Sequence, residues 1–226
     1  MTALTEPHVL PSVMSADFLR VGEQLDGLLG AGARLFHVDI MDGHFVPNLT
    51  LGPGFAEAVA GPIHAAGGLV DVHLMVAHPG SLIPSFASAA DAISVHYEAD
   101  PHPQRLLASI REAGCLAGLA VNRGTPPVLV EELIGDLDYV NCMAISPGFA
   151  GQEFIPATVE KLRRLREVLP DRVGLEVDGG VHAETLPAAR DAGANLFVSA
   201  SAIFGEPDPV AAYAGLAALA IAGDVA

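Results

Sequence analysis

Lysine is almost absent from this chain of 226 residues, in which Lys161 is the one example. Basic side chains number 11 and acidic side chains 27, so the formal net charge is −16 at pH 7. Such a surface lacks the cations that bind phosphate backbones and anionic lipid headgroups. We therefore expect neither nucleic acid nor a membrane among the partners.

Cysteine is scarce, and so are long hydrophobic runs. Cys115 and Cys142 are too few for a disulfide framework or a thiolate metal cluster, and we interpret them as buried apolar side chains in a reducing compartment. The late apolar stretch 209–223 is Ala-rich and too short to span a bilayer. Residues 1–9 show no basic segment followed by an apolar run, as a signal peptide would. These features predict a soluble, cytoplasmic protein.

What is present is an apolar, regularly alternating chain. Apolar residues make up 51% and charged residues 17%, which excludes a disordered protein. Short β-branched runs predict strands over 9–13, 35–40, 69–75, 92–96, 116–121, 139–145, 173–177 and 196–200. Amphipathic stretches bounded by Gly or Pro predict helices over 16–31, 53–66, 79–89, 103–113, 127–134, 157–169, 183–192 and 209–222.

Strict alternation of these elements, with no linker between them, favours an α/β fold in which residues 1–226 form a single (β/α)8 TIM barrel. An open, doubly wound sheet is the alternative. It would be expected to carry a G-x-G-x-x-G turn after its first strand, and this sequence has none there. The barrel is therefore the preferred prediction.

Polar residues interrupt the predicted strands near their C-terminal ends. His37 and Asp39 lie two apart in the second strand, His73 lies in the third, and Asp178 follows the seventh. In a barrel these ends meet at one mouth. Two imidazoles and two carboxylates suit Zn²⁺, Mn²⁺, Co²⁺ or Fe²⁺. The alternative is four separately hydrogen-bonded core side chains.

Other residues at strand ends are expected at the same mouth. His44 and His96 are placed to line it. Met41, Met75 and Met143 either fill the core or form a flexible apolar cover over a ligand.

Small residues follow the last three predicted strands. The first such loop is the segment 146–152, and shorter turns occur at Gly179–Gly180 and at Ala200–Ser201. Loops at these positions of a barrel often hold phosphate through backbone N–H groups. In a chain with almost no lysine, amides are the natural donors for an anionic ligand.

Six phrases in order make the chain resemble the ribulose-phosphate 3-epimerase family over nearly its whole length. They are PSVMSADF (11–18), HVDIMDGHFVPN (37–48), DVHLMV (71–76), PGFAGQ (147–152), EVDGG (176–180) and SAIFG (201–205). The resemblance implies the same barrel fold, one divalent metal ion with Zn²⁺ as the first choice, and interconversion of D-ribulose 5-phosphate and D-xylulose 5-phosphate. It also implies a small-molecule sugar phosphate as the partner, and we expect a homo-oligomer.

The resemblance also implies roles for individual residues. The metal ligands would be His37, Asp39, His73 and Asp178, with Asp39 and Asp178 serving also as the acid–base pair. The substrate contacts would be Ser12, His73, Gly148, Phe149, Ala150, Gly151, Asp178, Gly179, Gly180, Ala200 and Ser201. Removal of a proton beside a ketone and its return to the opposite face would pass through a cis-enediolate, with one carboxylate on each face.

The chain departs from the family pattern at three positions. Ser146 replaces Asn or a similar residue, Ala150 replaces a glycine of Gly-Phe-Gly-Gly, and Ala200 replaces the glycine of Gly-Ser. An added methyl at a phosphate-binding turn is expected to narrow it or change its backbone preference. A 3-epimerase for another ketose phosphate, such as D-allulose 6-phosphate, is therefore the alternative.

Rival activities on similar barrels need a lysine at the mouth. The related decarboxylases carry Asp-x-Lys-x-x-Asp on the second strand, where this chain has Asp39-Ile40-Met41-Asp42. Schiff-base aldolases need a lysine nucleophile, whereas Lys161 is expected in mid-helix, off the apolar stripe. A metal- or phosphate-binding barrel without turnover is the remaining alternative, and the presence of both Asp39 and Asp178 argues against it.

Overall fold

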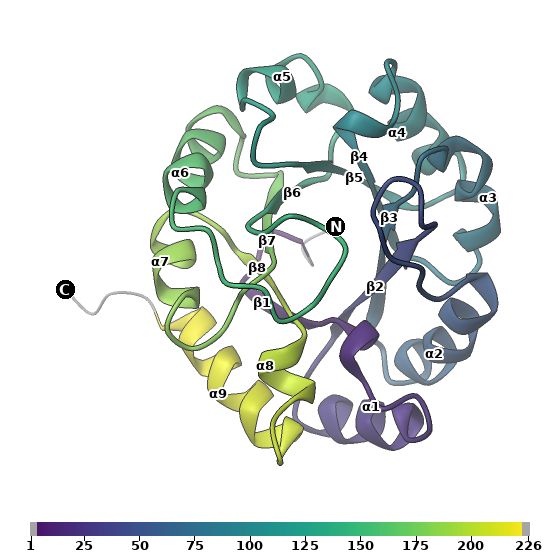
Figure 1. The fold of residues 1–226 in the computed structure, drawn as a ribbon, viewed down its shortest axis with the longest axis vertical. Coiled ribbons are helices and arrows are strands. Elements are labelled where there is room, and N and C mark those ends of the chain that lie inside the picture. The colour runs from purple at the N-terminus through teal and green to yellow at the C-terminus, as the bar shows by residue number, and fades with distance from the viewer. Residues whose placement is uncertain (1–3, 223–226) are drawn as a thin grey trace.

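A computed structural model describes residues 4–222 as one ring of eight parallel strands surrounded by helices, which confirms the predicted barrel (Figure 1). The strands are β1 (His8–Pro11), β2 (Leu35–Met41), β3 (Leu69–Met75), β4 (Ala92–His96), β5 (Leu116–Val121), β6 (Tyr139–Met143), β7 (Gly174–Asp178) and β8 (Leu196–Ser199). Hydrogen-bonded neighbours run in the order β1-β8-β7-β6-β5-β4-β3-β2. All the strands therefore point their C-terminal ends to the same mouth.

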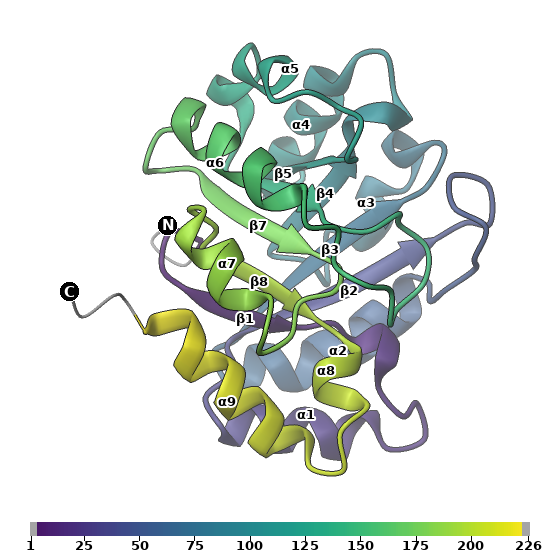
Figure 2. The same cartoon turned by 60° about the vertical axis from the view of Figure 1, so that its left-hand side comes forward.

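Helices cover the outside of this ring, as the two views agree (Figures 1 and 2). They are α1 (Val21–Gly30), α2 (Pro53–Ala65), α3 (Ile83–Phe86), α4 (Pro103–Glu112), α5 (Val128–Glu131), α6 (Thr158–Val168), α7 (Leu186–Asp191), α8 (Ser201–Phe204) and α9 (Pro209–Ile221). In this described part of the chain, no helix is both long and apolar enough to cross a membrane.

The ring closes at the functional end of the barrel. Strands β1 and β2 share no continuous ladder, and a single parallel bridge joins Ser12 to His37. The Ser12 hydroxyl then donates to Asp39 Oδ2 at 2.6 Å. The seam of the barrel is thus held by three of the residues predicted to form the site.

Alternation along the strands divides apolar from polar packing. One set of side chains, such as Val38, Val72 and Val140, packs outward against the helices in the main core. Inside the ring, a smaller cluster that includes Leu10 and Tyr139 fills the end opposite the mouth. Several of the remaining inward positions carry the polar residues of the site. Closer to the mouth, Met41 and Met75 form a further apolar cluster with Val46.

Four predicted helices are clearly shorter in the structure. The segment 183–192 is helical only over Leu186–Asp191, and the other three are shortened for local reasons. The first begins at Val21, because the Asp17 side chain accepts the Leu19 N–H at 3.0 Å and forms a turn. The segment 79–89 divides into a 3-10 turn, Pro79–Ser81, and the short α3, whose Pro84 lacks an N–H to continue the pattern. The segment 127–134 forms α5 and a following 3-10 turn.

Strand bounds shift by a few residues, and one helix was not predicted. β1 ends at Pro11 rather than at 13, and β6 ends at Met143 rather than at 145. The one-turn helix α8 directly follows β8. Four residues are too few for a periodic signal, so hydrophobic patterning does not reveal it.

The interior packing predicts that Gly118→Ala is destabilising. Gly118 of β5 pairs with Tyr139 of β6, and a Cβ at Gly118 would overlap the buried Tyr139 ring. Overpacking of this kind lowers the free energy of unfolding by about 1–3 kcal/mol. Gly215→Ala in α9, where a Cβ meets no atom within 4 Å, is the control and should gain up to about 1 kcal/mol. Urea unfolding measures both, and equal stability of Gly118→Ala and the parent would contradict the packing argument.

Candidate active site

Three strands bring four ionisable side chains together at the mouth of the barrel. His37 and Asp39 come from β2, His73 from β3 and Asp178 from β7, and all four are buried. Each offers one ligand atom, and these atoms lie within 4.8 Å of one another. The sequence pattern had predicted this set of four, and the barrel register brings it together.

Particular atoms of these residues face one another. Asp39 Oδ1 lies 3.2 Å from His37 Nε2 and 3.2 Å from His73 Nδ1. Asp178 Oδ2 lies 3.4 Å from the same His73 nitrogen and 3.9 Å from His37 Nε2. The inner nitrogens are therefore Nε2 of His37 and Nδ1 of His73, and both carboxylates reach them.

The outer imidazole nitrogens are hydrogen-bonded as well. His37 Nδ1 lies 2.7 Å from Asp71 Oδ2, and the Tyr139 hydroxyl donates to the other oxygen of that carboxylate. His73 Nε2 lies 3.0 Å from His96 Nε2. Outer partners of this kind fix the orientation and tautomer of metal-binding imidazoles.

The charges in the cluster stabilise one another. Burial by itself raises the pKa of Asp39, but His37 and His73 outweigh it and lower this pKa well below its ordinary value. Burial likewise lowers the pKa of both imidazoles, and the surrounding carboxylates outweigh it and raise each pKa above its ordinary value. The imidazoles and carboxylates of the cluster therefore favour each other's charged forms.

The cluster fits a divalent transition metal. Its donors are two imidazole nitrogens and two carboxylate oxygens, a set that suits Zn²⁺, Mn²⁺, Co²⁺ or Fe²⁺ better than Mg²⁺ or Ca²⁺. A cation would replace the protons that the imidazoles carry without it. The chain thus has a buried His/Asp cluster that could hold a metal ion.

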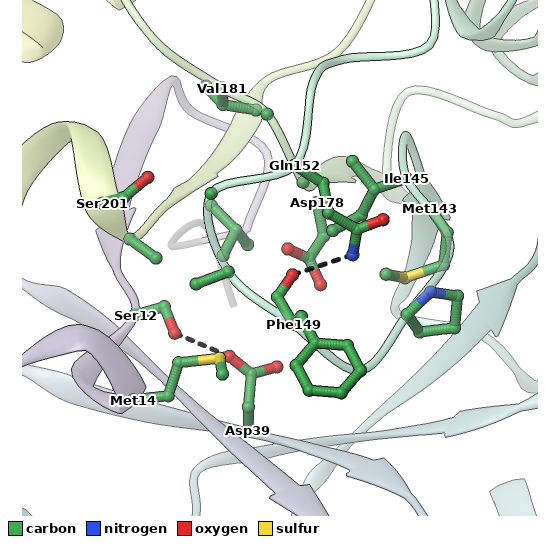
Figure 3. A pocket seen from close by; sticks show the side chains of 18 of the residues that line it. Ser12, Met14, Asp39, Met143, Ile145, Phe149, Gln152, Asp178, Val181 and Ser201 are labelled. Carbon is green, nitrogen blue, oxygen red and sulfur yellow. Dashed lines mark hydrogen bonds between the residues drawn. The ribbon is translucent and has the colours of Figure 1, made fainter. Parts of the chain in front are cut away.

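A cavity of about 220 Å³ opens directly above this cluster. Figure 3 shows Asp39 and Asp178 pointing into it, with Met14 and Met143 beside them. The predicted substrate residues that line it are Ser12, Gly148, Phe149, Ala150, Gly151, Asp178, Gly179, Gly180, Ala200 and Ser201. His73 lies below the cavity, fully buried, and does not line it.

Methionines form much of the apolar wall. Met41, Met75 and Met143 all line the cavity, and each is also at least 97% buried. The two interpretations of these residues, core filling and an apolar cover, therefore apply together. Met14 adds a fourth sulfur-containing side chain that the sequence pattern did not single out.

The segment between β6 and α6 crosses the front of the barrel and covers the cavity (Figure 1). Asn48 Nδ2, from the loop after β2, donates to Gly148 O at 2.7 Å. Gln152 Nε2 donates to Ser146 O at 2.7 Å and to Phe149 O at 2.9 Å. Gly148 has a φ of +126°, a conformation that favours glycine. These contacts hold the segment in its covering position.

The departures from the family pattern do not require a glycine conformation. Among the described residues, every residue with a positive φ is a glycine, so Ala150 and Ala200 both have a negative φ. Ala200 has a φ of −110°. The expected change in backbone preference is therefore absent, and what remains of the expectation is the added methyl at the cavity wall.

A buried polar layer beneath the four ligand residues was not assigned by the sequence pattern. It contains Asp71, Ser94, Asn141 and Glu176, all fully or almost fully buried. Burial, followed by the nearby Asp71 carboxylate, raises the pKa of Glu176 well above its ordinary value. The available signal for Asp71, Ser94 and Glu176 was spacing, because each lies two residues before a polar residue of the same strand. Asn141 has no such neighbour.

Lys161 differs from its expected place. It was expected off the apolar stripe of its helix, yet only 8% of the residue is exposed. Its ammonium donates to Asn122 O in the loop after β5, and burial lowers its pKa. The long aliphatic stem allows this arrangement, because it packs while the charged end reaches a carbonyl. Lys161 does not line the active-site cavity, so the exclusion of lysine-dependent chemistry stands.

Glu98 connects the histidines of the site to the loop after β5. Its Oε2 lies 3.2 Å from His96 Nδ1, and its Oε1 accepts the Asn122 N–H at 3.0 Å and the Thr125 hydroxyl. Burial raises the pKa of Glu98, but these hydrogen bonds outweigh it and lower the pKa to about 2. Sequence spacing had placed His96 at the mouth, but it gave no indication of this partner.

Comparison with known proteins gives consistent matches. The model of the Ribulose-phosphate 3 epimerase family matches residues 8–204. Ribulose-phosphate 3-epimerase from Bacillus subtilis (strain 168) is 43% identical over 205 residues, which cover 88% of this chain and 93% of that protein. The protein of the same name from Escherichia coli (strain K12) is 43% identical over 204 residues, covering 88% of this chain and 90% of that protein.

Solved structures share the fold at low identity. Tryptophan synthase from Mycobacterium tuberculosis superimposes with a TM-score of 0.71 at 16% identity, covering 98% of this chain and 95% of that chain. 3-Hexulose-6-phosphate synthase from Salmonella typhimurium gives 0.70 at 15% identity, covering 95% of this chain and 98% of that chain. At these identities the likeness concerns the barrel architecture alone.

The hydrogen bonds at Glu98 predict an acid-sensitive contribution to stability. Because the folded-state pKa of about 2 lies below the unfolded value of about 4.3, the contribution is complete above pH ~4.3 and is lost as the pH falls toward 2. We expect the stability difference between the parent and Glu98→Gln, both metal-free, to shrink by on the order of 2 kcal/mol over that interval. Urea unfolding at a series of pH values measures it. A difference that stays constant with pH contradicts the assigned hydrogen bonds.

Proposed function

The chain belongs to the ribulose-phosphate 3-epimerase family, and from that premise we propose that it interconverts D-ribulose 5-phosphate and D-xylulose 5-phosphate in a metal-dependent reaction. One observation carries the chemistry: carboxylates from two well-separated strands, Asp39 of β2 and Asp178 of β7, reach the same closed cavity. Epimerisation at C3 needs an acid and a base on opposite faces of the carbon.

The two aspartates supply this pair. One carboxylate removes the C3 proton from one face of the substrate, and the other, protonated, returns a proton to the opposite face. In the reverse reaction the roles exchange, so the direction of turnover decides which aspartate begins as the base. Ser12 Oγ, which donates to Asp39 Oδ2 at 2.6 Å, keeps that carboxylate oriented. Methionine side chains make the wall beside the two carboxylates apolar.

His37, Asp39, His73 and Asp178 would hold the metal ion, for which Zn²⁺ is the first choice. Such a cation supplies electrophilic stabilisation of the negative charge that develops beside C3 when the proton leaves. Asp71 and His96 hold the outer nitrogens of the two imidazoles and so keep their inner nitrogens directed at the site.

The substrate phosphate would bind at the far wall of the cavity. The backbone N–H groups of 148–151, Gly179–Gly180 and Ala200–Ser201 line that wall, in agreement with the chain's shortage of basic side chains. Phe149 covers this region from the β6–α6 segment. Phosphate contacts of this kind fix the sugar so that C3 lies between the two aspartates.

We propose further that residues 1–226 act as one catalytic domain, although 1–3 and 223–226 lie outside the described residues. The homo-oligomeric state and the cytoplasmic location stay predictions. Epimerisation of another ketose phosphate, such as D-allulose 6-phosphate, is the alternative, since Ala150 and Ala200 add methyl groups to the cavity wall.

Removal of the metal should abolish turnover. We expect protein stripped with a chelator to lose activity toward ribulose 5-phosphate, and Zn²⁺, Mn²⁺, Co²⁺ or Fe²⁺ to restore it, because the developing charge then regains its cation. A coupled assay with elemental analysis of each sample is the measurement, and full activity without metal contradicts the proposal. The same reloaded protein, assayed side by side with allulose 6-phosphate, distinguishes the two substrates by kcat/KM.

The two-face geometry predicts solvent exchange at C3. Because the proton delivered to the product comes from the second carboxylate, turnover in D₂O should place deuterium at C3. Asp39→Asn and Asp178→Asn should each lower kcat by about 10²-fold or more. The exposed Asp171→Asn is the matched control and should be unaffected. Since both site residues also bind metal, the metal content of each variant is measured first. Product formed in D₂O with its original C3 hydrogen retained would exclude the two-carboxylate mechanism.

A further inference from the structure

The two imidazoles of the site have different outer partners. His37 is held by the Asp71 carboxylate, a partner that only accepts at neutral pH. His73 is held by a second histidine, His96, whose ring lies 5.0 Å away between centroids and is inclined by 26°. A neutral imidazole can either donate or accept at a given nitrogen, so this second contact needs a further group to define its direction.

The positions of the protons follow from the partners. When a metal ion occupies the cluster, His73 would bind it through Nδ1, the nitrogen that faces Asp39 and Asp178, so the nitrogen that carries hydrogen toward His96 is Nε2. His96 Nε2 must then accept. The hydrogen of a neutral His96 consequently lies on Nδ1, which is 3.2 Å from Glu98 Oε2.

His96 is well suited to remain neutral in this position. Its side chain is fully buried, and Glu98 Oε2 lies within hydrogen-bonding distance of its Nδ1. The Phe45 ring packs against it at 4.7 Å between centroids. His96 is therefore enclosed between an aromatic ring and the imidazole that it orients.

We propose that His96 and Glu98 are positioning residues that set the tautomer and orientation of His73, and so tune metal binding at the proposed active site. The inference rests on the metal-dependent function proposed above. Glu98 is the end of the chain of hydrogen bonds, because an ionised carboxylate accepts and cannot donate. Neither residue touches the cavity, and both act through His73.

The loop after β5 holds Glu98 in place. Its other oxygen accepts the Asn122 N–H and the Thr125 hydroxyl, while Asn122 O accepts from the buried Lys161 of α6. The single lysine of the chain, Lys161, therefore stabilises the loop after β5, which in turn holds the Glu98 carboxylate. Contacts from β4, the loop after β5 and α6 thus converge on one metal-binding imidazole.

Glu98→Gln tests the arrangement because an amide cannot accept on both sides. If the oxygen of the new amide accepts from Asn122 and Thr125, its NH₂ group donates to Nδ1 of His96. Nδ1 must then accept, so the hydrogen of His96 lies on Nε2. Two N–H donors would then face each other, because the Nε2 atoms of His96 and His73 lie 3.0 Å apart. If the amide is reversed, its NH₂ group opposes the Asn122 N–H instead. Glu98→Asp retains a carboxylate and should recover part of the function.

The experiment uses two measurements on the full chain. Zn²⁺ affinity is measured by competition with a chelator, and imidazole tautomers are measured by long-range ¹H–¹⁵N spectra of the Zn²⁺-loaded protein. We expect Glu98→Gln to weaken Zn²⁺ binding by about 10- to 100-fold, Glu98→Asp to weaken it less, and His96 to change from the Nδ1–H to the Nε2–H form in Glu98→Gln. His64→Gln is the matched control, because His64 also pairs with a carboxylate, Asp91 at 2.8 Å, but on the surface.

Each result decides between the alternatives. Unchanged Zn²⁺ affinity in Glu98→Gln, or a loss of equal size in His64→Gln, overturns the proposal. An Nε2–H form of His96 in the unmodified protein also overturns it, and this measurement needs no variant to fold. If the unmodified protein binds no Zn²⁺ at all, the metal-dependent function fails, and the tautomers of His73 and His96 alone decide the positioning role.

Discussion

The burial of four ionisable side chains within 4.8 Å of one another is the constraint on which the rest of this structure depends. Unpaired charges in such a place would cost several kcal/mol each. The cluster therefore needs compensation inside it, from imidazole–carboxylate pairs, and around it, from hydrogen bonds to every outer nitrogen. The closure of the barrel contributes as well. The single β1–β2 bridge joins Ser12 to His37, and the Ser12 hydroxyl donates a hydrogen bond to Asp39.

Composition and site chemistry agree. A chain with a net charge of −16 and one lysine cannot gather ammonium groups around a phosphate. Its cavity is instead lined by residues of the small-residue turns after β6, β7 and β8, together with methionine side chains. In the proposed reaction, a metal ion at the His/Asp cluster would supply the positive charge. The acidic protein thus concentrates its electrophilic function in one place.

The barrel and the four ligand residues could be predicted because both depend on local periodicity. Strand positions two apart share a face, and parallel strands end at one mouth, so His37, Asp39, His73 and Asp178 converge from spacing alone. Other features depend on contacts between distant segments. The break at Pro84, the one-turn α8, the buried Lys161 and the Glu98–Asn122 hydrogen bond carry weak or no periodic signal. The polar layer at Asp71 and Glu176 did have the signal, two residues from known site residues.

The unequal support of the two imidazoles has a structural cause. On β3, Asp71 occupies the inward position beside His37, so a carboxylate reaches His37 Nδ1 directly. The neighbouring strand β4 offers no carboxylate level with His73, and Ser94 is its register partner. The next inward residue of β4, His96, contacts His73 instead. Its other nitrogen contacts the Glu98 carboxylate, which lies beyond the end of the strand. Because Glu98 is held by the loop after β5, the geometry at His73 depends on that loop, whereas the geometry at His37 depends only on the barrel interior.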